Sequence, residues 1–214
     1  MSDWSAISTP EFWITMLVLV LSIGLHEYGH AKFADLAGDP TPRMMGRVTL
    51  NPIKHLDPVG TIFMVISSLA GVGIGWGKPV MVNPDKMRNP RWDHFVSVAA
   101  GPAMNLLLAF VSALLFRVFG QSAGGYVSMF LFTSVIVNVA LMIFNLIPLG
   151  PLDGHWIVGA FLPDRQRAAW YQFNRGIGTI FFLLLVLLPG RPLSHLMGPG
   201  ISKIALFLLG GHPA

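Results

Sequence analysis

The sequence contains no cysteine among its 214 residues. Disulfides, thiolate nucleophiles and thiolate metal ligands are therefore excluded, and any bound metal must be held by His, Asp or Glu. Charge is also scarce, because only 11% of the residues are charged, against about 25% in an ordinary soluble domain. Together with 53% hydrophobic residues, this shortage predicts a protein that resides in the lipid bilayer.

Long apolar stretches recur along the chain and predict membrane-spanning helices. Four are long enough to cross a bilayer, at 12–34, 94–119, 126–150 and 166–188, and the first is too long for the core of a signal peptide. Two others, 58–75 and 196–209, fall below the roughly 20 residues that a spanning helix needs. We therefore expect an all-α polytopic membrane protein of about four to six transmembrane helices. We expect one domain over 1–214, with its core at about 12–160 and C-terminal helices at about 164–210.

The basic residues predict the orientation. Eight of the fourteen Lys and Arg residues lie at 32–91, seven of them between the first and second long runs, and Arg165 and Arg167 lie at the start of the fourth. Basic residues mark cytoplasmic loops, so the N-terminus is expected outside, with 35–93 and 151–165 in the cytoplasm. The formal charge of +4 would also suit a nucleic-acid partner, but in so apolar a chain we expect none.

The segment between the first two long runs is more than a loop. Residues 48–51 and 80–83 have the pattern of short β-strands, and an apolar, glycine-rich stretch at 60–77 lies between them. Irregular backbone at membrane depth persists only where protein or water satisfies its hydrogen bonds. We therefore expect a re-entrant element with short strands beside a cavity; the alternative is a further short span.

A motif with catalytic potential, His-Glu-Tyr-Gly-His at 26–30, stands inside the first apolar run. Positions four apart share one face of a helix, so His26 and His30 can bind one metal ion. Glu27 is one of only two glutamates and lies about 100° round the helix from His26, where it can act as general base toward a water at the metal. The alternative is a pair of core histidines, but an intramembrane charge costs about 2.5 kcal/mol or more and calls for a function.

A third ligand is expected from the segment Asn-Leu-Ile-Pro-Leu-Gly-Pro-Leu-Asp-Gly at 145–154. Asp153 is the only acidic residue between Asp93 and Asp164, and the prolines before it interrupt the helix. If 58–75 does not cross the membrane, Asp153 emerges at the same end as the two histidines. The alternative is that Asp153 caps the helix that follows it.

These two motifs, with Gly-Pro-Ala-Met-Asn at 101–105, resemble the site-2 protease family of intramembrane metalloproteases over about residues 20–160. The compact chain is similar to small prokaryotic members without a PDZ or nucleotide-sensing domain. The resemblance implies one zinc ion per chain held by His26, His30 and Asp153, with Glu27 as catalytic base, in a prokaryotic cell membrane. It also implies that Asn145 lies near the reacting carbonyl and that Asn105 supports a ligand or packs helices, although an intramembrane Asn often simply bonds a neighbouring helix.

The expected substrates are membrane proteins, cut in or near a transmembrane helix that first unwinds and adds to a strand edge. The candidate substrate-binding residues are Gly75, Trp76, Gly77, Lys78, Pro79 and Val80. Two alternatives are a divalent-metal transporter, in which Glu27 would have no role, and a catalytically silent membrane scaffold, in which the catalytic residues would serve nothing. His155 could support the site, whereas His55, His94, His195 and His212 fit membrane interfaces and need no function.

Overall fold

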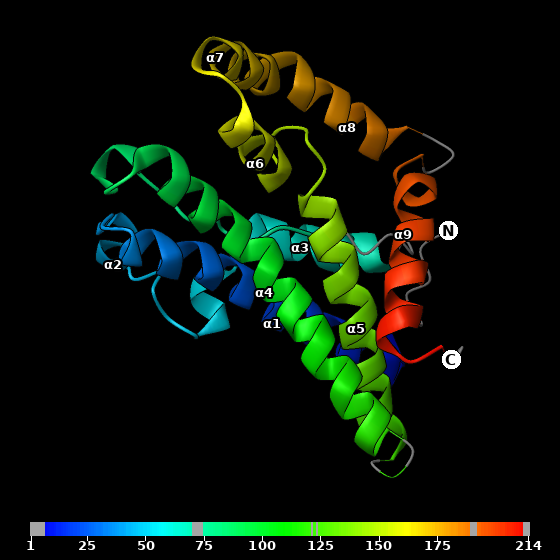
Figure 1. The fold of residues 1–214 in the computed structure, drawn as a ribbon. Coiled ribbons are helices and arrows are strands. Elements are labelled where there is room, and N and C mark those ends of the chain that lie inside the picture. The colour runs from blue at the N-terminus through cyan, green and yellow to red at the C-terminus, as the bar shows by residue number, and fades with distance from the viewer. Residues whose placement is uncertain (1–6, 70–74, 121, 123, 189–191, 212–214) are drawn as a thin grey trace.

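The computed structural model describes residues 7–69, 75–120, 122, 124–188 and 192–211, and these form a helical protein without a β-sheet (Figure 1). The α-helices in chain order are α1 (Pro10–Leu36), α2 (Thr41–Met44), α3 (Pro58–Leu69), α4 (Pro90–Phe119), α5 (Gly125–Asn145), α6 (Asp153–Phe161), α7 (Asp164–Phe173), α8 (Thr179–Leu187) and α9 (Pro192–Leu208). Short 3-10 turns occupy Pro52–His55 and Pro84–Lys86, and a π turn at Asn174–Gly178 joins α7 to α8.

Four helices are long and apolar enough to cross a bilayer. They are α1, α4, α5 and the continuous helix Asp164–Leu187 that α7, the π turn and α8 form together. These coincide with the four long runs of the sequence, so the prediction of a helical membrane protein is confirmed. At 1.5 Å per residue the 21-residue α5 is about 31 Å long, which matches a hydrocarbon core of about 30 Å. Large apolar side chains such as Phe110, Leu114 and Phe181 are exposed on these helices, where lipid tails would cover them.

Proline sets several helix ends. Helices α1 and α4 each begin at a proline that follows a capping residue, Thr9 or Asn89, whose side chain accepts a hydrogen bond from the first turn. Helix α5 ends at Asn145, before the end of the apolar run, because Pro148 and Pro151 cannot continue a helix. The segment that carries Asp153 is thereby released from α5.

Helices α1, α4 and α5 pack together at the centre of the fold. Between α1 and α4, a β-carbon on Gly29 would lie only 2.8 Å from the carbonyl oxygen of Ala100, so the bare glycine allows the two helices to approach closely. Helix α9 packs on α4 and α5 through a buried cluster that includes Ala109, Val139 and Ala205. His26 and His30 lie on α1 on either side of Gly29.

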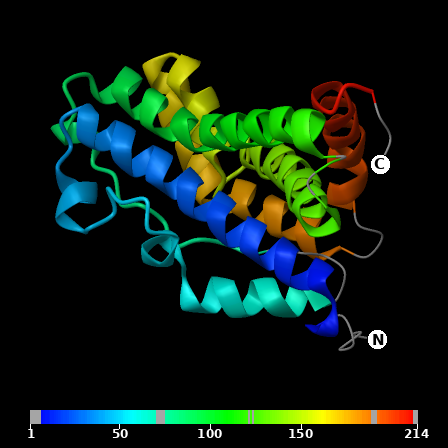
Figure 2. The ribbon, with the colours of Figure 1, turned by 90° about the horizontal axis from the view of Figure 1, so that it is seen from below.

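The stretch 58–75 forms no spanning helix in its described part. Helix α3 has 12 residues, about 18 Å, and lies beside the first half of α1 (Figure 2). Residues 70–74 lie outside the described part of the chain. A β-carbon on Gly75 would lie 2.4 Å from the β-carbon of Met64, and one on Gly60 would lie 2.2 Å from the carbonyl oxygen of Trp76. The chain therefore runs back along α3 after leaving it.

The two short strands expected at 48–51 and 80–83 are not present, and this prediction is wrong. A single antiparallel bridge between Leu56 and Gly77 takes their place. The guanidinium group of Arg47 donates hydrogen bonds to the carbonyls of Lys54 and Lys78, at 2.6 and 3.4 Å. Among the described residues no second strand runs beside residues 78–83, so the segment is extended without a partner strand.

Helices α6, α7 and α8 form an arm that lies to one side of α4 and α5 (Figure 1). Within its apolar window the Asp164–Leu187 span is 17% buried, against 33–50% for the other three spans. This span is therefore the least buried of the four, and it contacts α6 through α7 and both α5 and α9 through α8.

Candidate active site

His26 and His30 lie one turn apart on α1, on the face that packs against α4, and both are buried. Their Nε2 atoms are 3.0 Å apart and their rings are nearly perpendicular, at 87°. The spacing of four residues places both imidazoles on one side of the helix, as the sequence predicts. Two nitrogen atoms thus face a common point inside the protein.

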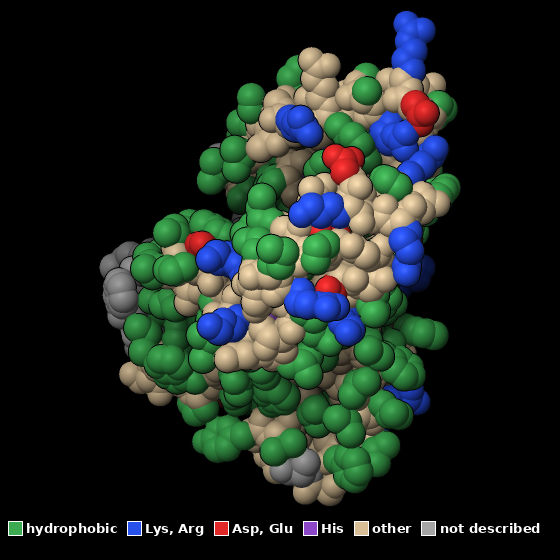
Figure 3. Space-filling view, turned by 90° about the vertical axis from the view of Figure 1, so that its left-hand side faces the viewer, with side chains coloured by type: hydrophobic (Ala, Val, Ile, Leu, Met, Phe, Trp, Pro, Cys, Tyr) green, Lys and Arg blue, Asp and Glu red, His purple; other side chains and the backbone are tan. Residues whose placement is uncertain are grey.

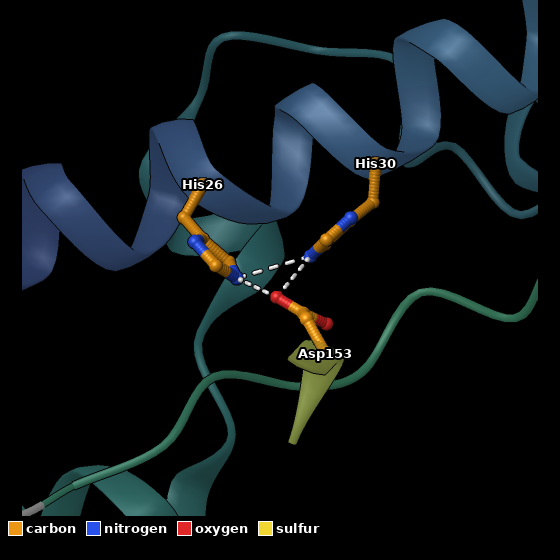
Figure 4. Close-up of side chains that lie close together, drawn as sticks. All are labelled: His26, His30 and Asp153. Atoms are coloured by element: carbon orange, nitrogen blue, oxygen red, sulfur yellow. Dashed lines mark hydrogen bonds and ion pairs between the residues drawn. The ribbon is translucent and has the colours of Figure 1, made fainter. Parts of the chain in front are cut away.

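Asp153, the first residue of α6, brings a carboxylate to the same point (Figure 4). Its Oδ2 atom lies 3.3 Å from Nε2 of His26 and 3.4 Å from Nε2 of His30. In the described part of the chain, these three residues form a group whose possible ligand atoms all lie within 4.8 Å of one another. The capping alternative is wrong, because Leu152 holds the N-cap position and no side chain caps α6.

The three atoms fit a zinc ion. Ligands about 2.0–2.1 Å from a tetrahedral zinc lie about 3.3 Å from one another, close to the three separations seen between these atoms. The Oδ2 atom of Asp153 is buried without a hydrogen-bond partner among the described residues, and such an atom is costly to bury. A cation between the three side chains would satisfy it. Two imidazoles and a carboxylate are also a donor set of catalytic zinc sites, which keep one further position open.

Hydrogen bonds from α4 orient both imidazoles. Nδ1 of His30 donates to the carbonyl oxygen of Ser97 at 2.9 Å, and Nδ1 of His26 pairs with Oδ1 of Asn105 at 2.7 Å. Because both acceptors are oxygens, each histidine carries its proton on Nδ1 and turns the lone pair of Nε2 to the centre of the site. Metal-binding histidines are commonly oriented in this way.

A buried chain of amides sets the orientation of Asn105. Its Nδ2 donates to Oδ1 of Asn138 on α5 at 2.9 Å, and Nδ2 of Asn138 donates to the carbonyl oxygen of Ser134. The amide oxygen of Asn105 is therefore left facing His26. Helices α1, α4 and α5 all contribute to this network, so Asn105 orients His26 in addition to packing the helices together.

Gly101 on α4 packs directly against the two imidazole rings. A β-carbon at this position would lie 2.3 Å from Nε2 of His30 and 2.8 Å from Cε1 of His26, closer than non-bonded atoms can approach. Only glycine leaves room for both rings between α1 and α4. The sequence contained Gly101 within the 101–105 motif, but nothing local to it indicated contact with the histidines.

Helix α6 is held against the N-terminal end of α4 by Arg91. Its Nε donates to the carbonyl oxygen of Ala160 at 2.7 Å and its Nη2 to that of Leu162 at 3.1 Å. A guanidinium group suits the carbonyl groups left unpaired at a helix C-terminus.

Glu27 lies on the next position of α1 and faces the extended segment 75–83. Its Oε2 atom accepts a hydrogen bond from the backbone N–H of Val80 at 3.2 Å, and its side chain lies beside Gly77. The far end of the segment is fixed by the buried Asp39, whose carboxylate accepts hydrogen bonds from the N–H groups of Thr41 and Asn83. The extended segment therefore holds Glu27 in place through the N–H group of Val80.

A cavity of about 520 Å³ contains these groups. Glu27, both histidines and Asp153 line it, and so do all the residues of the expected substrate-binding element except Lys78, whose N–H donates to the carbonyl oxygen of His55. Asn145 is also in the wall, with its Nδ2 bonded back to the carbonyl oxygen of Leu141 at 3.0 Å. The cavity is therefore shared by the metal-binding group, the acid and the segment 75–82.

Three further residues of the wall carry polar side-chain atoms and were not expected from the sequence: His94, Ser97 and Trp156. His94 had been assigned to a membrane interface, but it lies on the same face of α4 as Ser97 and its ring contacts that of Trp156 at 5.2 Å. His155 supports the loop, because its Nδ1 bonds the carbonyl oxygen of Leu152, and burial lowers the pKa of His155. No local pattern in the sequence predicts these contacts, because they join segments that are far apart in the chain.

Two known proteins are similar in sequence to this chain. The protein named "Putative zinc metalloprotease YwhC" of Bacillus subtilis (strain 168) is 37% identical over 181 residues, which cover 81% of this chain and 80% of that protein. The protein named "Putative zinc metalloprotease Rip2" of Mycolicibacterium smegmatis is 31% identical over 190 residues, covering 85% of this chain and 73% of that protein. No solved structure matches the chain. Residues 14–123 and 114–189 match the description of Peptidase family M50, and the chain therefore belongs to this family, the site-2 proteases.

Proposed function

We propose that this protein is an intramembrane zinc endopeptidase that hydrolyses peptide bonds in or near the transmembrane segments of other membrane proteins. The main support for the proposal is that His26, His30, Asp153 and Glu27 line one cavity in a bundle of helices long enough to span a membrane. The family and the names of two relatives support a metalloprotease.

His26, His30 and Asp153 would hold one zinc ion per chain. When bound, zinc supplies a Lewis acid that polarises a water molecule and the carbonyl to be attacked. Glu27 takes the proton of the attacking water and passes it to the leaving amine. The N–H of Val80 holds one oxygen of Glu27, which leaves the other oxygen free for the proton. Asn145, in the same wall, is our candidate for a hydrogen bond to the reacting carbonyl.

The extended segment 75–82 is our candidate for substrate binding. The main chain of Met81 and Val82 forms no hydrogen bond within the described residues, and Met81 is exposed. An unwound stretch of substrate could pair with these groups as an added strand, because a helix hides its own carbonyls until it unwinds. Such a pairing would lay the substrate along the wall that holds Glu27.

We further propose that 58–75 is re-entrant, with the N-terminus outside and the site toward the cytoplasm. The shortness of α3 and the return of the chain along it support this reading. Lys and Arg side chains gather on one face of the molecule (Figure 3). Exposed basic residues of the segment between α1 and α4 include Arg43, Lys54, Lys78 and Arg88, and basic loops favour the cytoplasmic side.

The substitution Glu27→Gln tests this function, and Glu11→Gln is its matched control, because Glu11 is exposed in the first turn of the same helix. Glu27→Gln should retain zinc, measured by elemental analysis of the purified protein, and should abolish cleavage. Single-span membrane proteins should then accumulate in membranes that carry Glu27→Gln, compared by quantitative proteomics with wild type and Glu11→Gln.

Each other outcome selects another function. Cleavage that persists in Glu27→Gln would refute Glu27 as the base, and a wild-type protein without bound metal would refute the metalloprotease. Zinc flux into proteoliposomes would favour a transporter. Identical membrane proteomes for wild type and Glu27→Gln, with zinc bound in both, would favour a silent scaffold.

A further inference from the structure

The Asp164–Leu187 span reaches the site through one buried side chain, Asn174. It is the first residue of the π turn, is 1% exposed, and has both ends of its amide bonded. Its Oδ1 accepts a hydrogen bond from the N–H of Gly150 at 2.7 Å, and its Nδ2 donates to the carbonyl oxygen of Trp170 at 3.1 Å. The amide thus joins the fourth span to the loop that carries Asp153.

The contact between this loop and the span is close. A β-carbon on Gly150 would lie 2.6 Å from the carbonyl oxygen of Asn174, so the approach requires glycine. That same carbonyl oxygen accepts a hydrogen bond from the hydroxyl of Thr179 at 2.6 Å. π turns are frequent at functional sites, and this one presents a satisfied amide to the loop instead of a continuous helical face.

A second hydrogen bond reaches the other side of Asp153. The indole Nε1 of Trp170 donates to the carbonyl oxygen of His155 at 2.8 Å. Trp170 and Asn174 are one turn apart and are joined to each other by the Asn174 amide. Gly150 precedes Asp153 in the chain and His155 follows it, so the two bonds hold the main chain on both sides of this acid.

Asp153 depends on these main-chain bonds for its position. Among the described residues, its buried Oδ2 atom forms no hydrogen bond, and it lies 3.3 and 3.4 Å from the Nε2 atoms of His26 and His30. At the start of α6, no side chain caps the helix. The carboxylate is therefore placed by the path of its backbone between Gly150 and His155.

We propose that Trp170 and Asn174 are positioning residues, which fix the carboxylate of Asp153 for metal binding from the fourth span. Neither side chain touches the three ligand atoms, and the inference rests on the proposed zinc site. Metal sites tolerate deviations of about 0.2 Å in ligand distance, so a loop released on one side would bind the ion more weakly. The fourth span, the least buried of the four, thereby acquires a role in the site.

Zinc affinity, measured by competition with a chelator in the Glu27→Gln background, tests this role without any need for cleavage. Trp170→Phe removes the N–H and keeps an aromatic ring, and Asn174→Ala removes both amide bonds. We expect the affinity to fall about tenfold for Trp170→Phe and up to about 100-fold for Asn174→Ala, as for other residues that orient metal ligands. The matched control is Phe182→Ala, which loosens the same span at its ring contact with Phe144.

The control separates positioning from packing. Phe182→Ala and Asn174→Ala should both lower the thermal stability, but Phe182→Ala should leave the zinc affinity unchanged. Wild-type affinity in both Trp170→Phe and Asn174→Ala would overturn the inference, and so would an equal loss in Phe182→Ala. If Asn174→Ala does not fold, Trp170→Phe decides the question. A parent protein that binds no zinc would instead refute the proposed function itself.

Discussion

Gly101→Ala is the substitution that most directly tests the proposed metal site. The added methyl group would point at both imidazoles, 2.3 Å from Nε2 and 2.4 Å from Cε1 of His30, and 2.8 Å from Cε1 of His26. Non-bonded carbon atoms pack at about 3.5–4.0 Å, so both rings would have to move by about 1 Å. The rings cannot move away freely, because Ser97 and Asn105 hold their Nδ1 atoms.

The expected loss of zinc affinity follows from this displacement. A shift of about 1 Å is several times the tolerance of about 0.2 Å in a metal–ligand distance. Loss of a residue that merely orients a ligand costs about 10–100-fold in affinity. Displacing two ligands should therefore cost at least about 100-fold, which is about 2.8 kcal/mol at 1.4 kcal/mol per factor of ten. Cleavage activity should fall at least as far.

The assay is zinc affinity by chelator competition on purified protein, with size-exclusion chromatography and circular dichroism to verify folding. Gly198→Ala in α9 is the matched control, because no atom lies within 4 Å of a β-carbon built there. It should bind zinc like the wild type and be slightly more stable, since Ala favours a helix over Gly by about 1 kcal/mol. A folded Gly101→Ala protein with wild-type zinc affinity would refute the geometry of the site.

Three other substitutions test parts of the site. Asn105→Leu removes the partner of His26 Nδ1 and should lower zinc affinity about 10–100-fold in the same competition assay, whereas Leu107→Ala on the exposed side of α4 should not. Arg91→Gln breaks the two hydrogen bonds to the end of α6 and should lower the zinc affinity. Arg91→Lys should have an intermediate affinity, and the control Arg165→Gln, at an exposed residue, should bind zinc like the wild type. Equal affinity in all three variants would contradict the role of Arg91. Burial alone would raise the pKa of Asp39, but the hydrogen bonds from Asn83 and Thr41 outweigh it and lower that pKa. The ionised Asp39 therefore stabilises the fold at neutral pH, and this contribution is lost as the pH falls below about 3.9, so the melting temperature of Asp39→Asn should depend less on acid than that of the wild type.

Much of the fold was predictable because the bilayer imposes simple rules. A spanning helix needs a long apolar run, and the four runs of the sequence became the four candidate spans. The strands at 48–51 and 80–83 were wrong because a strand requires a neighbour, and pairing is a property of the whole fold. The segment's actual partners are the backbone of His55, the carboxylate of Asp39 and the acid Glu27.

The sequence by itself determined the local part of the site. Helical spacing places His26 and His30 on one face and Glu27 beside them, since this geometry depends on only five consecutive residues. It also singled out Asp153 as the acid able to complete the group, because no other acid lies nearby in that part of the chain.

Only the tertiary structure decided what surrounds these residues. The contact of Gly101 with both imidazoles, the orientation of His30 by a backbone carbonyl, and the hold of Trp170 and Asn174 on the Asp153 loop all join segments far apart in the chain. A backbone carbonyl has no identity in the sequence, and a glycine reveals the need for space only when its neighbours are in place. Such contacts arise from helix packing, which sets distances that no local pattern encodes.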